Sequence, residues 1–307
     1  MGSGCCCRCC KRRRKNRVSP HGLPYKDFPH FVNRDGNYLF CRYWEPATEP
    51  RAMLMIVHGA GEHSGYYSDF TSIFTDMSLF VFAHDHFGHG QSEGKRLTVP
   101  DFSIYVRDCQ QHIDMMRDRY PTLPLFLLSQ SLGASITLNV VTKRRDITGL
   151  IFMAPLVQVN ADSVSASRMC CNSILYYLMP NLTVGNVDPH WLSSSAEEVQ
   201  KIVDDPLSIL GPYRMRYTIQ VLNAVAKLKE IMPTITVPVL IAHGELDKLC
   251  EIKGSFLLYK NVASQDKTLK IFKNALHHIH KETPSIVAEL KVLIRKWLRD
   301  HLPLVVD

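Results

Sequence analysis

Residues 125–135 read LFLLSQSLGAS, an apolar run that leads into small residues around a serine. The run is typical of a buried β-strand, and the segment after Ser131 has the pattern of a helix. A serine at such a junction, with small residues two positions before and after it, predicts a sharp turn that exposes its hydroxyl group. Ser131 is therefore a candidate nucleophile. Ser129 stands where the G-x-S-x-G pattern has its first glycine, and an ordinary helix N-cap serine is the alternative interpretation.

Strand-like runs alternate with helix-like patterns along most of the chain on both sides of this stretch. Near-continuous apolar strands separated by helices predict an α/β fold with a mostly parallel central sheet, flanked by helices on both faces. The expected strands are 37–44, 52–59, 79–85, 124–130, 149–157, 237–244 and 268–272, and the expected helices are 102–120, 131–144 and 284–302.

The alternation breaks down between residue 157 and about residue 230. Serine, asparagine, methionine and aromatic residues cluster there, and no helical pattern emerges before about residue 220. We expect a cap, or lid, inserted between two strands of the sheet, so that residues 18–307 form one domain with a cap at about 157–230. A composition of 46% hydrophobic residues over 307 positions is enough to build one large core.

A serine hydroxyl is a weak nucleophile near neutral pH and needs a base, which a carboxylate orients in turn. In folds of this kind the order along the chain is Ser, then Asp or Glu, then His, each after a strand. Asp247 follows one expected strand, and His277, His278 and His280 follow the next. A surface-turn aspartate and a solvated histidine cluster are the alternatives, and the spacing does not choose among the three histidines.

The glycine-rich segment HGAGEHSG, residues 58–65, follows an early strand. An oxyanion hole combines the amide of the residue after the nucleophile with an amide from such a loop. We therefore expect the amides of Leu132 and Ala60 to form one, although a simple glycine-rich turn has the same sequence.

Two histidine clusters require comparison with metal sites. The segment FAHDHFGHG contains His84, Asp85, His86 and His89 at ligand-like spacings, and HHIH begins at His277. Neither comes with the rest of a recognisable ligand set. The sequence therefore predicts no metal and no cofactor.

Residues 1–17 differ from the remaining chain in charge. They hold seven Lys or Arg and no acidic residue, whereas the other residues contain 29 basic and 29 acidic side chains. The neutral body argues against a broad nucleic-acid footprint on the folded domain. No signal-peptide core and no stretch of about 18 apolar residues occurs, so neither secretion nor a spanning helix is indicated.

This leader also holds half of the ten cysteines, and their arrangement is not that of a disulfide framework. Cysteines before a basic run predict S-acylation next to an anionic inner leaflet. Each Lys or Arg there adds about 1 kcal/mol to the free energy of membrane binding. We expect a disordered, lipidated leader and a cytoplasmic protein at the cytosolic face of membranes. Myristoylation of Gly2, metal binding and a basic arm for nucleic acid are the alternatives. The candidate lipidation sites are Cys5, Cys6, Cys7, Cys9 and Cys10.

Longer segments carry a family resemblance over about residues 18–300. HGAGEHSG, FAHDHFGHGQSEG, SQDKTLKI and HIHKE resemble, in order and spacing, the monoacylglycerol lipases of the α/β-hydrolase fold. The resemblance implies a serine hydrolase that cleaves monoacylglycerols to fatty acid and glycerol through an acyl-enzyme. It also implies that Ser131, Asp247 and His277 form the catalytic triad and that Ala60 and Leu132 form the oxyanion hole.

The same resemblance implies the substrate contacts. Glu62 and His280 match positions that hold the glycerol end, and Cys250 matches a cysteine beside the pocket. Tyr66 stands where the family has an arginine for the glycerol head. The matches to the acyl tunnel are Leu156, Val187 and Leu249. In this family the cap dips into membranes, so the apolar residues of NSILYYLMP, residues 172–180, are expected at a bilayer surface, and a cap helix packed on the core is the alternative. The expected partners are a lipid substrate and a membrane surface through leader and cap.

Three departures leave alternatives open. SQSLG replaces GHSMG, Tyr66 replaces the arginine, and Ile209 and Arg216 replace cap cysteines. Strain at Ser129 could reduce turnover. A catalytically weakened or inactive membrane-tethered lipid-binding protein, or a lysophospholipase or thioesterase of the same fold, is therefore the alternative function. The sequence does not predict an oligomeric state.

Overall fold

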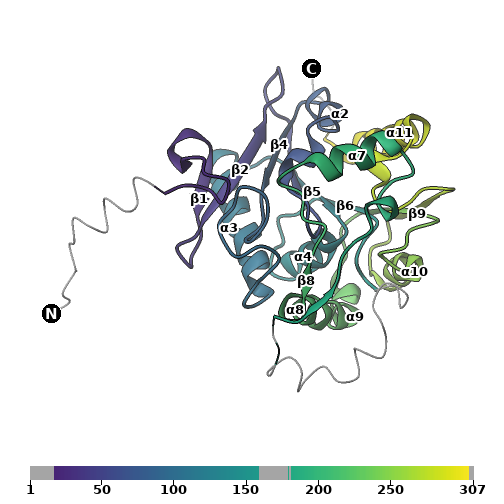
Figure 1. Ribbon diagram of the computed structural model, residues 1–307. Helices are drawn as coiled ribbons and strands as arrows, with labels where there is room; N and C mark the ends of the chain where they lie inside the picture. The colour runs from purple at the N-terminus through teal and green to yellow at the C-terminus, as the bar shows by residue number, and fades with distance from the viewer. Residues whose placement is uncertain (1–16, 159–178, 180, 304–307) are drawn as a thin grey trace.

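An eight-stranded sheet forms the centre of the computed structural model, which describes residues 17–158, 179 and 181–303 (Figure 1). The strand order is β1-β2-β4-β3-β5-β6-β9-β10. Pairing is antiparallel from β1 to β2 and from β2 to β4, and parallel across the rest. The predicted mostly parallel α/β sheet is confirmed. The strands are β1 (His30–Val32), β2 (Tyr38–Trp44), β3 (Ala52–Val57), β4 (Leu79–His84), β5 (Leu125–Gln130), β6 (Gly149–Met153), β9 (Val239–Gly244) and β10 (Lys267–Phe272).

Helices cover both faces of this sheet because successive strand residues point to opposite sides. Met55 of β3 belongs to the apolar cluster beneath α3, α4, α8, α9 and α10, whereas its neighbour Leu54 belongs to the cluster beneath α2, α7 and α11. Fully buried strands therefore read as continuous apolar runs. The helices are α2 (Ser72–Thr75), α3 (Ser103–Arg119), α4 (Leu132–Val141), α7 (Ala196–Asp204), α8 (Met215–Ala226), α9 (Leu228–Ile231), α10 (Ile252–Asn261) and α11 (Pro284–His301).

The chain between β6 and β9 is an insertion, because these two strands pair directly in the sheet, with Phe152 opposite Ile241. Its described part contains more regular structure than the sequence suggested. The two-stranded ribbon of β7 (Thr183–Gly185) and β8 (Tyr213–Arg214) precedes α8, and α7 begins behind the N-cap Ser195. The expectation of no helix before about residue 220 is wrong here. The assignment of this insertion as a cap stays a prediction.

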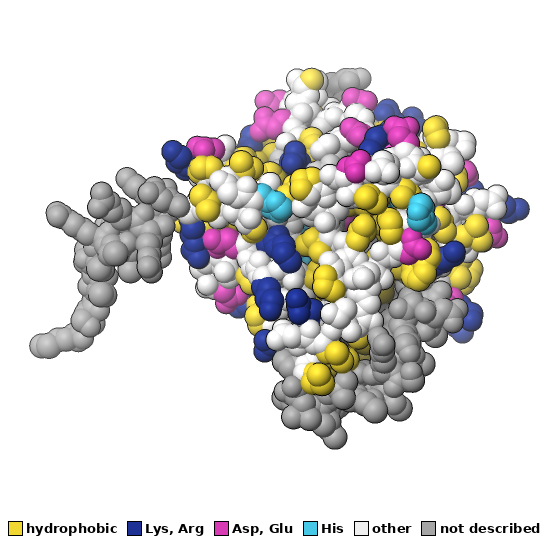
Figure 2. Space-filling model, viewed as in Figure 1, with side chains coloured by type: hydrophobic (Ala, Val, Ile, Leu, Met, Phe, Trp, Pro, Cys, Tyr) yellow, Lys and Arg dark blue, Asp and Glu magenta, His cyan; other side chains and the backbone are white. Residues whose placement is uncertain are grey.

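Short turns of 3-10 helix join several of these elements. They are η1 (Tyr25–Asp27), η2 (Ser64–Tyr67), η3 (Pro189–Trp191), η4 (Met232–Thr234) and η5 (Ile279–Lys281). Among the described residues, no helix combines the length and the apolar character needed to cross a bilayer. Both basic and acidic side chains lie on the visible face, mostly toward its margins (Figure 2), in keeping with the balanced charge of the chain after the leader.

Candidate active site

Ser131 lies at the turn between β5 and α4, where the backbone adopts φ 50° and ψ −118°. A positive φ is uncommon for a residue with a side chain and is held here by the strand before it and the helix after it. Gly133 lets that helix start so close to the sheet, because a Cβ atom there would lie 2.0 Å from the carbonyl oxygen of Val57. The predicted strand-turn-helix geometry around Ser131 is therefore present.

Ser129 fits this turn without a left-handed backbone. It is not among the residues with positive φ, and it pairs within the sheet opposite Val57 and Phe152. Its buried hydroxyl lies 2.6 Å from that of Thr137, two turns along α4, so its polar group has a partner. The expected strain at this position is not seen, because glycine is required only where φ is positive or where a neighbour comes too close.

Asp247 and His277 meet at the carboxyl ends of β9 and β10. The Asp247 Oδ2 atom lies 2.7 Å from His277 Nδ1, and His243 Nε2 lies 3.1 Å from the same oxygen. The other oxygen, Oδ1, accepts hydrogen bonds from the backbone amides of Leu249 and Cys250. The carboxylate is thus fixed on both sides and orients the histidine ring.

The buried surroundings shift the pKa of both groups. Burial alone raises the pKa of Asp247, but the charge of His277 and the hydrogen bonds from His243 and His277 outweigh it and hold that pKa well below its usual range. Burial lowers the pKa of His277, but Asp247 more than compensates, and the net pKa lies above the usual value. His277 is therefore suited to accept a proton.

A second buried acid–histidine pair stands beside the first. Glu62 Oε1 lies 2.9 Å from His278 Nε2, while Glu62 Oε2 accepts hydrogen bonds from Tyr67 Oη at 2.6 Å and from the Gly59 amide at 3.0 Å. Burial by itself raises the pKa of Glu62. The charge of His278 and the hydrogen bonds with His278 and Tyr67 outweigh that effect and hold the pKa well below its usual range. This carboxylate fixes the loop that carries Ala60.

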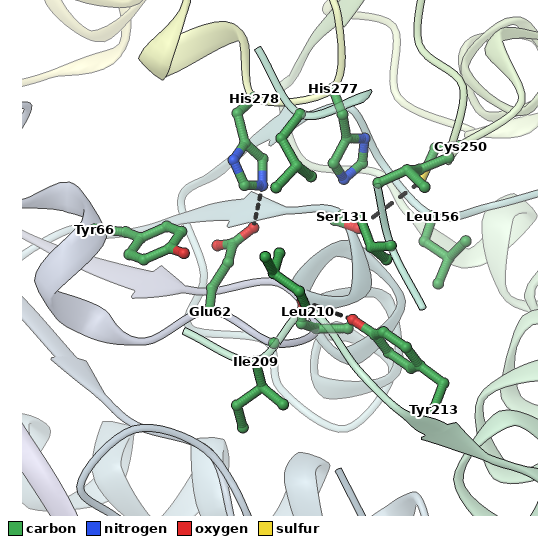
Figure 3. Close-up of a pocket in the computed structure, with 15 residues that line it drawn as sticks. Glu62, Tyr66, Ser131, Leu156, Ile209, Leu210, Tyr213, Cys250, His277 and His278 are labelled. Atoms are coloured by element: carbon green, nitrogen blue, oxygen red, sulfur yellow. Dashed lines mark hydrogen bonds and ion pairs between the residues drawn. The ribbon is translucent and has the colours of Figure 1, made fainter. Parts of the chain in front are cut away.

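A cavity of about 150 Å³ connects these groups (Figure 3). Ser131 and His277 both line it, as does Ala60 of the glycine-rich loop. Leu132 is the first residue of α4, so its N–H has no acceptor within the helix. The remaining lining residues are Gly61, Glu62, Tyr66, Leu156, Val187, Leu192, Ile209, Leu210, Tyr213, Leu249, Cys250 and His278.

Comparison with known proteins agrees with this arrangement. A family model described as serine aminopeptidase, S33, matches residues 48–284. Monoglyceride lipase of Homo sapiens is 42% identical over 283 residues, which is 92% of this chain and 93% of the relative. Monoglyceride lipase of Mus musculus is 41% identical over 287 residues, which is 93% of this chain and 95% of the relative. The chain belongs to the monoglyceride lipase family.

Solved structures agree with the fold of this family. A crystal structure of Paleococcus ferrophilus monoacylglycerol lipase superposes with a TM-score of 0.74 at 26% identity, covering 86% of this chain and 99% of the other. A soluble variant of monoglyceride lipase from Saccharomyces cerevisiae gives 0.81 at 22% identity, covering 94% and 97%. The α/β-hydrolase fold is confirmed.

Within this family member, most of the expected substrate-binding residues lie at the cavity. Glu62, Tyr66, Leu156, Val187 and Leu249 all line it. Their roles stay predictions, as do those of the triad and the two amides.

His280 is the exception among these residues. Its ring stacks on Tyr67, with centroids 4.9 Å apart, and it borders a separate surface cavity with Lys281. His278 stands at the main cavity in its place. The sequence named His278 as one of three histidines after this strand but did not distinguish it from its neighbours.

Gln130 has a contact that sequence patterns did not reveal. Its Nε2 donates to the carbonyl oxygen of His277 at 3.2 Å and so links the turn at Ser131 to the histidine loop. No local signal could have found this bond, because its partners are 147 residues apart.

The three histidines of the segment FAHDHFGHG, His84, His86 and His89, are buried. His84, His86 and Cys109 each place one ligand-type atom within 4.8 Å of the others. Metal ligation by cysteine requires the thiolate, and burial raises the pKa of Cys109 well above its usual value. This environment opposes thiolate formation.

Proposed function

We propose that this protein is a serine hydrolase that cleaves monoacylglycerols to fatty acid and glycerol through an acyl-enzyme. The observation that carries the proposal is the joint presence of Ser131 and the Asp247–His277 pair at one apolar cavity. The monoglyceride lipase relatives support the choice of substrate class. No metal or cofactor takes part in the proposed reaction.

In the first half of the reaction, His277 takes the proton of the Ser131 hydroxyl as its oxygen attacks the ester carbonyl. Asp247 stabilises the imidazolium that forms. The amides of Ala60 and Leu132 donate to the oxyanion of the tetrahedral intermediate, where fixed donors reduce the barrier most effectively. His277 then protonates the glycerol oxygen as the ester bond breaks and the acyl group stays on Ser131.

In the second half, water attacks the acyl-enzyme while His277 accepts one of its protons. The tetrahedral intermediate collapses, His277 returns the proton to Ser131, and the fatty acid leaves. We assign the polar wall of Glu62, His278 and Tyr66 to the glycerol end of the substrate. We assign the apolar wall of Leu156, Val187 and Leu249 to its acyl chain.

The test is hydrolysis of 2-arachidonoylglycerol by the purified full chain, beside Ser131→Ala and Ser129→Gly. We expect the wild type and Ser129→Gly to be active and Ser131→Ala to be inactive. Lysophosphatidylcholine and an acyl-coenzyme A serve as competing substrates, because the fold alone does not fix the substrate. If the protein hydrolyses either of these substrates faster than 2-arachidonoylglycerol, the proposed substrate class is wrong.

A lipid-binding protein without activity would give a different result. An activity-based fluorophosphonate labels a reactive serine, so it should label the wild type but not Ser131→Ala. Absence of labelling in the wild type, together with a gain of activity in Ser129→Gly, would contradict the proposed enzyme.

We further propose that the protein is held at the cytosolic face of membranes by acylation of the leader. The leader cysteines lie outside the described residues. Val18 and Leu23 follow the leader closely and are 50% and 48% exposed, which supports an apolar surface near the anchor. Acyl chains combined with a basic run give stable anchoring, whereas one weak signal does not.

Membrane fractionation tests this anchor. Full-length protein with Cys5, Cys6, Cys7, Cys9 and Cys10 replaced by serine should leave the membrane fraction. The control replaces buried Cys41 by serine and leaves the leader intact. Equal sedimentation of the leader variant and the wild type would contradict the proposal.

A further inference from the structure

A second apolar cavity lies next to the one at Ser131 and shares a wall with it. The first has a volume of about 150 Å³ and the second about 170 Å³. The shared wall consists of Val187, Tyr213 and Leu249. The other residues that line the second cavity are Val184, Gly185, Asn186, Trp191 and Thr218.

Tyr213 is the only one of the three shared residues with a large planar side chain, and it is anchored at both ends. Its backbone belongs to β8, where it pairs opposite Gly185 of β7. Its hydroxyl donates to the carbonyl oxygen of Ala60 at 3.5 Å, and Figure 3 shows the ring reaching into the first cavity from β8. The ring is therefore held across the boundary between the two cavities.

The contacts around the Tyr213 hydroxyl restrict its movement. A Cβ atom at Gly61 would lie 3.1 Å from this hydroxyl and 2.2 Å from the Ile209 carbonyl oxygen, so the glycine-rich loop packs directly against it. Tyr217 lies on another side, with ring centroids 6.0 Å apart. Val187 and Leu249 are smaller aliphatic residues, so the tyrosine ring is the bulkiest side chain of the shared wall.

We propose that Tyr213 determines which acyl chains this enzyme accepts, because its ring narrows the passage between the cavity at Ser131 and the second apolar cavity. The inference rests on the proposed function. An acyl chain attached to Ser131 first enters the adjoining cavity. A short chain ends there, whereas a long chain has to pass the Tyr213 ring to reach the second cavity.

Apolar pockets distinguish substrates by size with useful sensitivity, since one methylene that fits badly changes the rate by about tenfold or more. The preference therefore depends on the width of the passage. A smaller side chain at residue 213 should favour long chains, and a larger one should exclude them.

The experiment measures kcat/KM on two series of esters with the full-length protein. One series is p-nitrophenyl butyrate, octanoate and palmitate, and the other is monooctanoin and monoolein. The variants are Tyr213→Leu, which widens the passage, and Tyr213→Trp, which narrows it. Tyr213→Phe is the matched control, because it keeps the ring and removes only the hydroxyl.

We expect the ratio of long-chain to short-chain kcat/KM to rise about tenfold in Tyr213→Leu and to fall in Tyr213→Trp. Tyr213→Phe should keep the ratio of the wild type. A general loss of folding would lower all rates together and leave the ratio unchanged. Titration with fluorophosphonate corrects each rate for the fraction of active protein.

A ratio that stays the same in both Tyr213→Leu and Tyr213→Trp would overturn the inference, and so would a selective loss of long-chain hydrolysis in Tyr213→Leu. A different result would refute the proposed function. A wild type that cleaves the p-nitrophenyl esters but neither monoacylglycerol would refute the substrate, while the ester series would still test Tyr213.

Discussion

Two neighbouring histidines, His277 and His278, have ring centroids 5.3 Å apart, and each binds a buried carboxylate from a different loop. His277 pairs with Asp247, which is fixed by amides of the loop after β9. His278 pairs with Glu62, which is fixed by the Gly59 amide of the loop after β3. One loop after β10 thus contacts the loops after β3 and β9, two strands that β5 and β6 separate in the sheet.

The comparison teaches that the residue type does not decide the role. Asp247 raises the pKa of a histidine that shares the cavity with the candidate nucleophile, so we expect this pair to serve proton transfer. Glu62 accepts a hydrogen bond from the Gly59 amide in the loop that carries Ala60, so we expect its pair to position the proposed oxyanion donor. Three variants and a pH profile test this division of labour.

The largest effect should follow Asp247→Asn. Loss of the carboxylate removes the charge that stabilises the imidazolium and leaves the wrong tautomer, so kcat should fall by about 10⁴-fold. The matched control is Asp266→Asn, since Asp266 pairs with His301 at 2.8 Å away from the cavity. Steady-state kinetics measures both, and similar losses in the two variants would refute the assignment.

A smaller effect should follow Glu62→Gln, which keeps the size but removes the charge that binds His278. Displacement of the Ala60 amide should lower kcat by about 10²-fold, because misplaced catalytic groups cost about that much. The control is Glu45→Gln, which breaks an exposed ion pair with Arg119. Unchanged kcat in Glu62→Gln would mean that this pair has no positioning role.

The same variant has a pH signature in stability. The depressed pKa of Glu62 gives a contribution to stability that is present above its unfolded pKa of about 4.3 and is lost as the pH falls toward the folded value. The melting temperature of Glu62→Gln should therefore change less with pH below about 4.3 than that of the wild type.

Tyr67→Phe should have a still smaller effect on activity, since it removes one of the three donors to Glu62. A hydrogen bond to a charged group contributes about 2 kcal/mol, and the free energy of unfolding should fall by about that amount. Tyr25→Phe is the control, because its hydroxyl donates to a neutral carbonyl group of Gln91. Denaturant unfolding compares them, and an equal or larger loss in Tyr25→Phe would contradict the expectation.

The smallest expected effect is a shift in the midpoint of the acid limb of the pH profile. His277 must be neutral to accept a proton, so kcat/KM should fall as the pH falls through its raised pKa. We expect the acid limb to have its midpoint above the ordinary value of about 6.5. In Asp247→Asn the residual activity should show a lower midpoint. A wild-type midpoint below 6.5 would be the contrary result.

Sequence patterns predicted most of the sheet because its strands are buried on both faces and read as apolar runs. They missed β1 and the 10-residue helix α10, and they gave no sign of α7 in the insertion. The edge strand β1 has three residues, with Phe31 buried and its neighbours not, which is too short for a recognisable pattern.

For the site, the sequence by itself predicted the serine turn and the order of Ser131, Asp247 and a histidine, because each follows a strand and the order is a property of the chain. The choice of His277 among the three histidines came from the family resemblance. Only the tertiary structure separated His278 from His280, joined Gln130 to the histidine loop and placed Tyr213 between two cavities. These contacts join residues far apart in sequence, or depend on which way a ring faces. Local patterns carry neither kind of information, since packing between elements decides both.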